Sequence, residues 1–348
     1  MALGGGTFVT QNKVLPGSYI NIVSAATTVS ALGKRGVVAI ALPIDKEKGT
    51  VIEITAEEFA KDAETILGFA NTADDAKPLR EIFLHAEKAI IYDIGDGTGV
   101  TVAGTCAALE PYEFNIIAAY TDTTADKTAY ITAAKNWVEA GKHCQAVVYN
   151  PTTAPNNEAI INLCTTVTDE NADPHALVAW VAGAEAGCGL NASCTNMIYD
   201  GEYTVDASLT QAQLETALTS GKLVLHRVYG DIRVLEDINS LTTFTQEKGE
   251  DFRYNQTMRV VQQSANDLAK LFNINYIGKI PNDQAGRDAF WADVVAYNRE
   301  LESIRAIENF DTSTVSVERG ETKKSIVVSY SIMPVNAMSQ LYMTVIVL

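Results

Sequence analysis

Continuous apolar segments alternate with helical patterns along the first two-thirds of this chain, and this alternation constrains the fold more than any other feature. Residues 36–42 read GVVAIAL and residues 114–120 read FNIIAAY. Strands buried on both faces have this continuous apolar character. The chain is therefore predicted to be α/β, with a mostly parallel sheet covered on both faces. The expected strands are residues 36–42, 89–93, 114–120, 145–149, 176–181, 223–229 and 232–235.

Helix start signals lie between these segments. In the capping box Thr55-Ala-Glu-Glu58, the threonine and glutamate side chains satisfy backbone N–H groups of the first helical turn, which predicts a helix from this point. A second capping box is expected at Ser208-Leu-Thr-Gln211. Further helices are predicted at residues 78–87, at residues 126–140 and after the Asn150-Pro151 turn.

The pattern changes from about residue 239, where two long amphipathic helices are predicted. Apolar residues recur at spacings of three and four from Met258 to Phe272 and again from Phe290 to Ile304. Short strands at residues 276–280, 315–317 and 326–332 make this part α+β. The predicted organisation is an N-terminal arm (1–26), an α/β domain (27–236), a C-terminal α+β domain (237–332) and a C-terminal arm (333–348).

Both ends of the chain contain segments that are predicted to be strands without a partner nearby in sequence. These are residues 16–25 (PGSYINIVSA) and residues 341–348 (LYMTVIVL). A strand of this kind either completes its own sheet or pairs with an exposed edge of another molecule. We expect two intermolecular arms, whose pairing residues are Leu15, Tyr19, Ile20, Ile22, Val23, Leu341, Tyr342, Thr344 and Ile346.

Composition excludes several classes of protein. The formal charge is −17 and the sequence pI is about 4.6, which argues against a nucleic-acid-binding surface because phosphates must be neutralised by clustered Lys and Arg. No apolar run approaches the roughly 18–20 residues that span a bilayer, and the start lacks a signal-peptide pattern, so neither membrane insertion nor secretion is expected. Five cysteines without a C-x-x-C pair predict reduced thiols.

The charge is unevenly distributed. Residues 1–221 have a net charge of −15, whereas residues 222–348 have a net charge of −2 and contain eight of the ten arginines. Arginine is favoured in ion pairs at interfaces, so the second part is a candidate interface layer. An evenly solvated surface accounts for the same counts equally well.

No motif indicates catalysis, a cofactor or a metal. Gly95, Gly97 and Gly99 follow an expected strand but lack the spacing of a phosphate loop, and because the next residues read as strand, a hairpin turn is expected. Residues 183–191 follow another expected strand, and an α/β enzyme with a small-ligand site there is the alternative interpretation. The four histidines do not have the sequence spacing of metal ligands and are interpreted as structural; they are His85, His143, His175 and His226.

The C-terminal third contains the segments 236–242 (EDINSLT), 266–268 (NDL), 276–283 (YIGKIPND), 286–287 (GR), 305–310 (RAIENF), 315–320 (VSVERG) and 334–345. These segments resemble the sheath protein of contractile phage tails and of phage-tail-like bacteriocins. Two segments near the start of the chain resemble the beginning of the family's sequences, namely residues 15–19 (LPGSY) and 35–37 (RGV). Many family members insert a β domain where this chain has only about twenty residues between Tyr92 and Tyr112, so a short β-hairpin is expected at about 93–112.

The resemblance implies a structural subunit without enzymatic activity or a cofactor. Copies would form hexameric rings stacked helically around a tail tube, linked by strand exchange, and contraction would drive the tube through a cell envelope. The implied partners are further copies of this chain and the tail tube, baseplate and tail terminator proteins. The implied location is a phage tail or bacteriocin particle assembled in the bacterial cytoplasm. The residues expected to make ion pairs with the tube or between subunits are Arg259, Lys270, Arg287 and Arg299.

Overall fold

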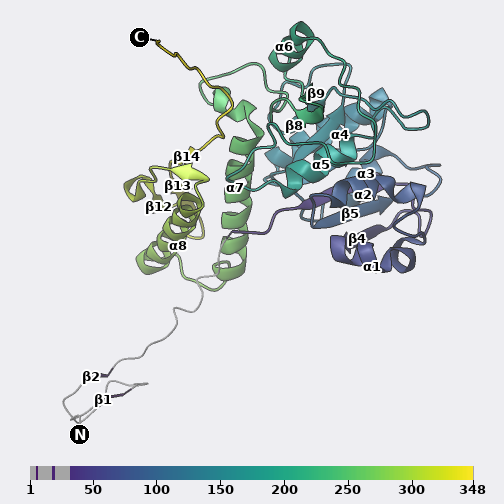
Figure 1. The fold of residues 1–348 in the computed structure, drawn as a ribbon. Helices are drawn as coiled ribbons and strands as arrows, with labels where there is room; N and C mark the ends of the chain where they lie inside the picture. The colour runs from purple at the N-terminus through teal and green to yellow at the C-terminus, as the bar shows by residue number, and fades with distance from the viewer. Residues whose placement is uncertain (1–4, 7–17, 20–31, 348) are drawn as a thin grey trace.

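The structure is a computed structural model that describes residues 5–6, 18–19 and 32–347. Figure 1 shows a helix-covered sheet and, beside it, a smaller part made of two long helices and short strands. In the N-terminal region, β1 (Gly5–Gly6) and β2 (Ser18–Tyr19) pair in parallel. The predicted arm residues Leu15, Ile20, Ile22 and Val23 lie outside the described residues.

The central sheet has six strands in the order β4-β5-β3-β6-β7-β8. Every neighbouring pair is parallel except β4 and β5, which are antiparallel at one edge. This confirms the predicted α/β class with a mostly parallel sheet, although β4 was not expected. The strands are β3 (Val37–Leu42), β4 (Val51–Thr55), β5 (Lys88–Asp93), β6 (Ile116–Ala119), β7 (Gln145–Tyr149) and β8 (Ile160–Leu163).

Each face of the sheet has its own core, because alternate residues of a strand point to opposite faces. Val38 and Ile40 of β3 pack with α1, α2 and α5, whereas Ala39 packs with α3 and α4. Covering helices on both faces are what the continuous apolar strands predicted. The helices are α1 (Ala56–Leu67), α2 (Lys77–Phe83), α3 (Val102–Leu109), α4 (Thr124–Glu139) and α5 (Val178–Gly187).

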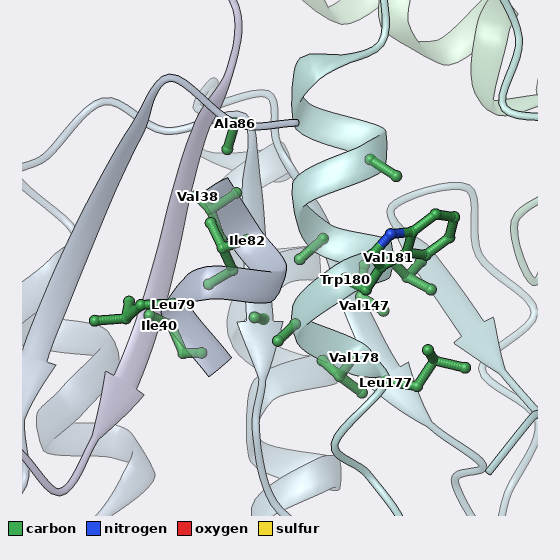
Figure 2. Packing of buried hydrophobic residues seen from close by; sticks show 14 of the residues in the cluster. Val38, Ile40, Leu79, Ile82, Ala86, Val147, Leu177, Val178, Trp180 and Val181 are labelled. Carbon is green, nitrogen blue, oxygen red and sulfur yellow. The ribbon is translucent and has the colours of Figure 1, made fainter. Parts of the chain in front are cut away.

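Helix α5 lies where a strand was predicted for residues 176–181, and Figure 2 shows it against α2 and the sheet. Residues 178–186 are all buried, so this helix has the same continuous apolar sequence as a buried strand. The two helices come close at Gly183 and Gly187, where a Cβ atom would lie 2.5 Å from the Ile82 carbonyl oxygen and 2.1 Å from that of His85. These glycines permit helix packing, so the expected turn at the carboxyl end of a strand is wrong, and the ligand site of the alternative interpretation loses that turn.

Other local predictions fail because an unexpected side chain or neighbour decides the conformation. Residues 100–103 do not form a hairpin strand within 93–112 but lead into α3, since Thr101 caps it by accepting from Gly104 N–H at 3.2 Å. The second capping box forms two residues late, between Thr210 and Gln213. The Asn150-Pro151 turn leads through a loop to β8 instead of a helix, and residues 276–280 are a helix-to-helix turn. The capping box at Thr55 and Glu58 is confirmed.

The two predicted amphipathic helices, α7 (Asn255–Asn275) and α8 (Gln284–Ser303), are confirmed, and their apolar stripes meet in a third core containing Val260, Phe290 and Leu301. The hairpin of β12 and β13 packs against α8. The remaining elements are η1 (Asp74–Ala76), α6 (Gln211–Thr219), β9 (Leu225–Val228), β10 (Asp231–Val234), η2 (Glu250–Arg253), β11 (Ile307–Glu308), η3 (Thr312–Thr314), β12 (Ser316–Arg319), β13 (Ile326–Ser329) and β14 (Met333–Pro334).

Beyond β14 the chain leaves the body as an extended arm (Figure 1). Its base is attached, because Val335 N–H donates to the Ala306 carbonyl oxygen at 3.0 Å and Ala337 N–H donates to Gln256 Oε1 at 2.9 Å. Residues 338–347 are exposed and belong to no strand in the described part of the chain. The arm therefore presents its backbone and apolar side chains to solvent.

Replacing Gly183 with alanine tests the close contact between α5 and α2. The added methyl group would overlap the backbone at Ile82, and such overpacking costs about 1–3 kcal/mol of the free energy of unfolding. The matched control is Gly104→Ala in α3, where the nearest atom would be 3.4 Å away and helix propensity favours alanine by about 1 kcal/mol. Urea unfolding should show Gly183→Ala destabilised and Gly104→Ala unchanged or stabilised; equal stabilities would contradict the packing.

Candidate functional site

Arg259 joins the helical part to the sheet part through a buried ion cluster. Its side chain is 0% exposed, Nη1 donates to Glu185 Oε2 at 2.5 Å and Nη2 donates to Asp237 Oδ2 at 2.7 Å. Nη2 also donates to the Ala192 carbonyl oxygen at 3.0 Å. The prediction that Arg259 lies exposed for pairing with a tube or another subunit is wrong, because both of its partners are in the same chain.

The sequence wrongly predicted an exposed Arg259 because α7 is buried on two sides. Its apolar stripe faces α8, but its polar side also has little exposure. On that side, Gln145 Nε2 donates to Asn255 Oδ1 at 3.0 Å and Asn266 Nδ2 donates to the His143 carbonyl oxygen at 2.8 Å. Hydrophobic periodicity assigns such residues to solvent, so it cannot detect a contact made by hydrogen bonds.

A third polar contact ties the chain at Gly33 to both long helices. The Asp267 carboxylate of α7 accepts from Gly33 N–H at 2.9 Å and from the Tyr297 hydroxyl of α8 at 3.1 Å. The segment that leads out of the N-terminal region is therefore held against the helical pair. These directional contacts fix one relative orientation of the two parts more strictly than apolar packing does.

The two carboxyl groups around Arg259 are in different electrostatic states. Burial raises the pKa of Glu185 well above its ordinary value, the Asp237 charge adds to this, and Arg259 opposes it. Burial would also raise the pKa of Asp237, but the Arg259 charge and hydrogen bonds from Glu185, Arg259 and Cys194 N–H together lower it to about 2. Asp237 therefore carries the charge that balances Arg259.

The same cluster has a spacing that would suit a cation. Ligand atoms of Glu185, Cys194 and Asp237 lie within 4.8 Å of one another. Arg259 already contacts both carboxyl groups, so a metal ion would have to displace a guanidinium group from its hydrogen bonds. The arrangement fits a charge-balanced structural contact better than a metal centre.

The other three predicted interface cations lie apart from this cluster and contact neighbours in the same chain. Lys270 pairs with Glu113 at 3.2 Å, and Arg299 pairs with Glu302 at 2.8 Å. Arg287 donates to Asn282 Oδ1 at 3.1 Å. The Lys270 and Arg299 pairs are largely open to solvent, whereas the Arg287 contact is partly buried. Exposed ion pairs contribute little to stability, so Lys270 and Arg299 can exchange partners.

The exposed arm and the β12–β13 hairpin are the parts suited to assembly. Leu341, Tyr342 and Ile346 are 83%, 87% and 79% exposed, and Thr344 is also exposed. In the described part of the chain, β12 and β13 pair only with each other, so each has an outer edge with unpaired backbone groups. An apolar extended segment and a short sheet with open edges are the kinds of elements that strand addition uses in general.

Two family models match this chain. The phage tail sheath protein central domain matches residues 96–240, and the phage tail sheath C-terminal domain matches residues 247–347, so together they cover more than half of the chain. The chain belongs to the phage tail sheath family. The C-terminal match includes the long helices, the β12–β13 hairpin and the exposed arm of this family member.

Relatives and solved structures agree with the family. The chain is 28% identical over 313 residues to a tail sheath protein of Clostridium phage phiCD119, covering 86% of this chain and 84% of the relative. The fold is similar to that of a sheath tail protein from Desulfitobacterium hafniense, with a TM-score of 0.78, 23% identity and coverage of 94% and 99% of the two chains. It is also similar to the contracted helical sheath of the anti-feeding prophage, with a TM-score of 0.68, 18% identity and coverage of 95% and 99%.

The alternative interpretation as an enzyme loses its main support in this sheath-family chain. It required a ligand-binding turn after a strand at residues 183–191, whereas residues 183–187 are the end of helix α5, and Gly183 and Gly187 lie against a neighbouring backbone. Among the helices of the described residues, none has both the length and the apolar character needed to cross a membrane.

Arg259→Met tests the buried cluster. Methionine retains most of the side-chain volume but leaves Glu185 and Asp237 without their cation, and breaking a buried pair costs about 3–5 kcal/mol. Arg299→Met is the matched control, with an expected cost below about 1 kcal/mol because its pair is exposed. The measurement is urea unfolding of both variants, and a loss of less than 1 kcal/mol for Arg259→Met would contradict the assigned role.

The lowered pKa of Asp237 predicts an acid-dependent contribution to stability. The carboxylate stabilises the fold above its unfolded pKa of 3.8, and this contribution, about 2 kcal/mol, is lost as the pH falls toward the folded value of about 2. The stability difference between the wild type and Asp237→Asn should therefore shrink by that amount between pH about 5 and about 2. A pH-independent stability difference between the wild type and Asp237→Asn would refute the prediction.

Proposed function

We propose that this chain is the subunit of a contractile sheath. Copies form hexameric rings that stack helically around a tail tube, each copy is linked to its neighbours by exchanged strands, and contraction drives the tube through a target cell envelope. The observation that carries the proposal is the presence, in the same chain, of an exposed apolar arm and of a β-hairpin with open edges. Family membership supports the same role.

The arm is long enough to reach another subunit. An extended chain rises about 3.3 Å per residue, so the segment from Val335 to Val347 reaches roughly 40 Å from its base. Exposure of its apolar side chains to water is unfavourable. Pairing with a strand edge would cover these side chains and would also give the backbone N–H and C=O groups of the arm hydrogen-bond partners. The arm therefore fits a partner that has an open strand edge.

The β12–β13 hairpin is the proposed acceptor. Each strand is four residues long, and Val327 on β13 is 59% exposed, so an added strand finds both backbone partners and an apolar contact. At roughly 1 kcal/mol net for each backbone hydrogen bond, a pairing of this length contributes a few kcal/mol. Links of this strength hold subunits together while the bodies between them rotate.

Separate arms and a rigid body suit a mechanical function. The buried Arg259 cluster holds the sheet part and the helical part in one orientation, so a copy moves as a unit and strain passes through the arms. Neither a cofactor nor an enzymatic step is needed. The partners of such a subunit are other copies and the tail tube, baseplate and tail terminator proteins, and its place is a phage tail or bacteriocin particle assembled in the bacterial cytoplasm.

Surface charge suggests which part faces the tube. The strongly acidic first part suits the solvated outside, and the nearly neutral second part suits the inner layer. On this second part, Lys270 and Arg299 lie in mainly exposed ion pairs, and Arg287 makes a partly buried hydrogen bond to Asn282. We assign them as candidate tube or intersubunit contacts, with interface carboxylates replacing their present partners.

Removal of residues 341–348 should abolish the formation of striated tubes at rising protein concentration, observed by negative-stain electron microscopy. Val345→Pro should have the same effect because it removes a backbone donor, whereas Val345→Thr, which keeps a β-branched side chain, should still assemble. The melting temperature of all variants should match that of the wild type, since the side chain at 345 is 73% exposed. Tubes formed equally well by the truncated chain would refute the arm as the link.

A further inference from the structure

The turn between β9 and β10 holds a tyrosine in a conformation that tyrosine rarely adopts. Val228 pairs with Asp231, so Tyr229 and Gly230 alone form the turn. Their φ angles are 49° and 101°, as in the left-handed two-residue turn that joins the strands of a tight hairpin. Asn-Gly or Asp-Gly is preferred in such a turn, because a bulky side chain crowds its own backbone at positive φ. Tyrosine therefore makes this hairpin less stable than asparagine would.

Tyr229 differs from the other left-handed residues in the described part of the chain. Seven non-glycine residues of that part have a positive φ, and five of them are Asn or Asp, which tolerate this conformation. Arg305 follows the end of α8, where one left-handed residue commonly ends a helix, and its N–H donates to the Glu302 carbonyl oxygen at 2.9 Å. Tyr229 has no such local cause. Unfavourable conformations of this kind cluster at functional sites.

The Tyr229 side chain makes no contact in its own subunit that would offset this cost. Its relative exposure is 105%, the highest value among the exposed large hydrophobic residues of the described chain. Leu223, just before β9, is bridged in parallel to Leu163 at the end of β8, so the hairpin continues beyond the carboxyl end of the sheet, with β9 beside β8 in Figure 1. The ring therefore projects into solvent, and tyrosine is a residue type that often dominates the binding energy of protein interfaces.

The hairpin is a basic site on an acidic protein. Residues 222–234 contain three basic side chains and one acidic one, whereas residues 1–221 have a net charge of −15. The acidic residue, Asp231, already pairs with Arg233 at 2.8 Å. Arg227 is exposed two residues before Tyr229, and within the described residues its side chain has no carboxylate partner. The tip thus presents an aromatic ring and an unpaired guanidinium group, which suit a surface rich in carboxylates.

We propose that the Tyr229 turn is a contact surface for another copy of this chain. The inference rests on the proposed function, because assembly from identical copies supplies the partner. The tip of one copy lies against the acidic first part of the next copy, which covers the ring and gives Arg227 a carboxylate partner. Because the basic tip and the acidic surface belong to the same chain, this head-to-tail contact can repeat from copy to copy. It joins the bodies directly, in addition to the link through the arms.

Tyr229→Asn separates the stability of the hairpin from its role in assembly. Asn-Gly fits the turn, so the melting temperature should rise by about 2 °C, whereas self-association should weaken. In sedimentation velocity of the full-length chain at rising concentration, the midpoint of association should increase by about tenfold or more. Tyr229→Phe is the matched control, because it keeps the ring and the unfavourable turn and should associate as the wild type does.

Arg227→Glu tests the charge at the tip. The midpoint of association should again rise, because a carboxylate would face the acidic surface of the next copy. The melting temperature should equal that of the wild type, since the side chain is exposed and unpaired among the described residues. An unchanged midpoint for this variant would contradict the acidic partner surface.

Nitration of the wild type by tetranitromethane tests the contact without any variant. Peptide mapping should show Tyr229 modified in dilute protein and protected in assembled protein, whereas Tyr297, which is 1% exposed, should stay unmodified in both. Equal association of Tyr229→Asn and the wild type, or a Tyr229 that stays reactive after assembly, would overturn the proposal. Negative-stain electron microscopy distinguishes this failure from that of the proposed function. Tubes that form without Tyr229 would refute the contact alone, whereas compact oligomers that need Tyr229 would support the contact and refute the sheath.

Discussion

The buried contact of Arg259 with Glu185 and Asp237 holds the molecule in one shape. Its three members come from α7, from α5 and from the connection between β10 and η2, so one guanidinium group joins three distant stretches of the chain. Removing these charges from water is costly, and the cost is repaid only when the hydrogen bonds are well formed. Any shift of the helical part relative to the sheet would leave a charge buried without a partner, so the contact selects one arrangement.

That constraint separates the chain into a rigid body and an extended arm. The body has three cores, two on the sheet and one between α7, α8 and the short strands, and the polar contacts of α7 connect them. The arm leaves this body at β14 and has its apolar residues in solvent. The proposed function uses both properties, because proposed motion between rings would require bodies that do not deform and links that do not break.

Prediction from sequence succeeded where local patterns and burial agree. The β3 segment is apolar on both faces and is a central strand, and the Thr55–Glu58 box caps α1 because both partners lie within one turn. It failed for α5, since a helix buried all round has no polar face to reveal its period. It also failed for Arg259, because a charged residue on a polar helix face appears exposed unless its distant partners are known.

The sequence by itself determined the α/β class, the two long helices, the acidic character and the family, because these depend on periodicity, composition and contiguous motifs. Tertiary structure alone decided that α5 is a helix, that Gly183 and Gly187 serve packing, and that Arg259 is internal. Each of these depends on atoms from separate elements that approach within a few ångströms, and such proximity leaves no periodic signal in the chain.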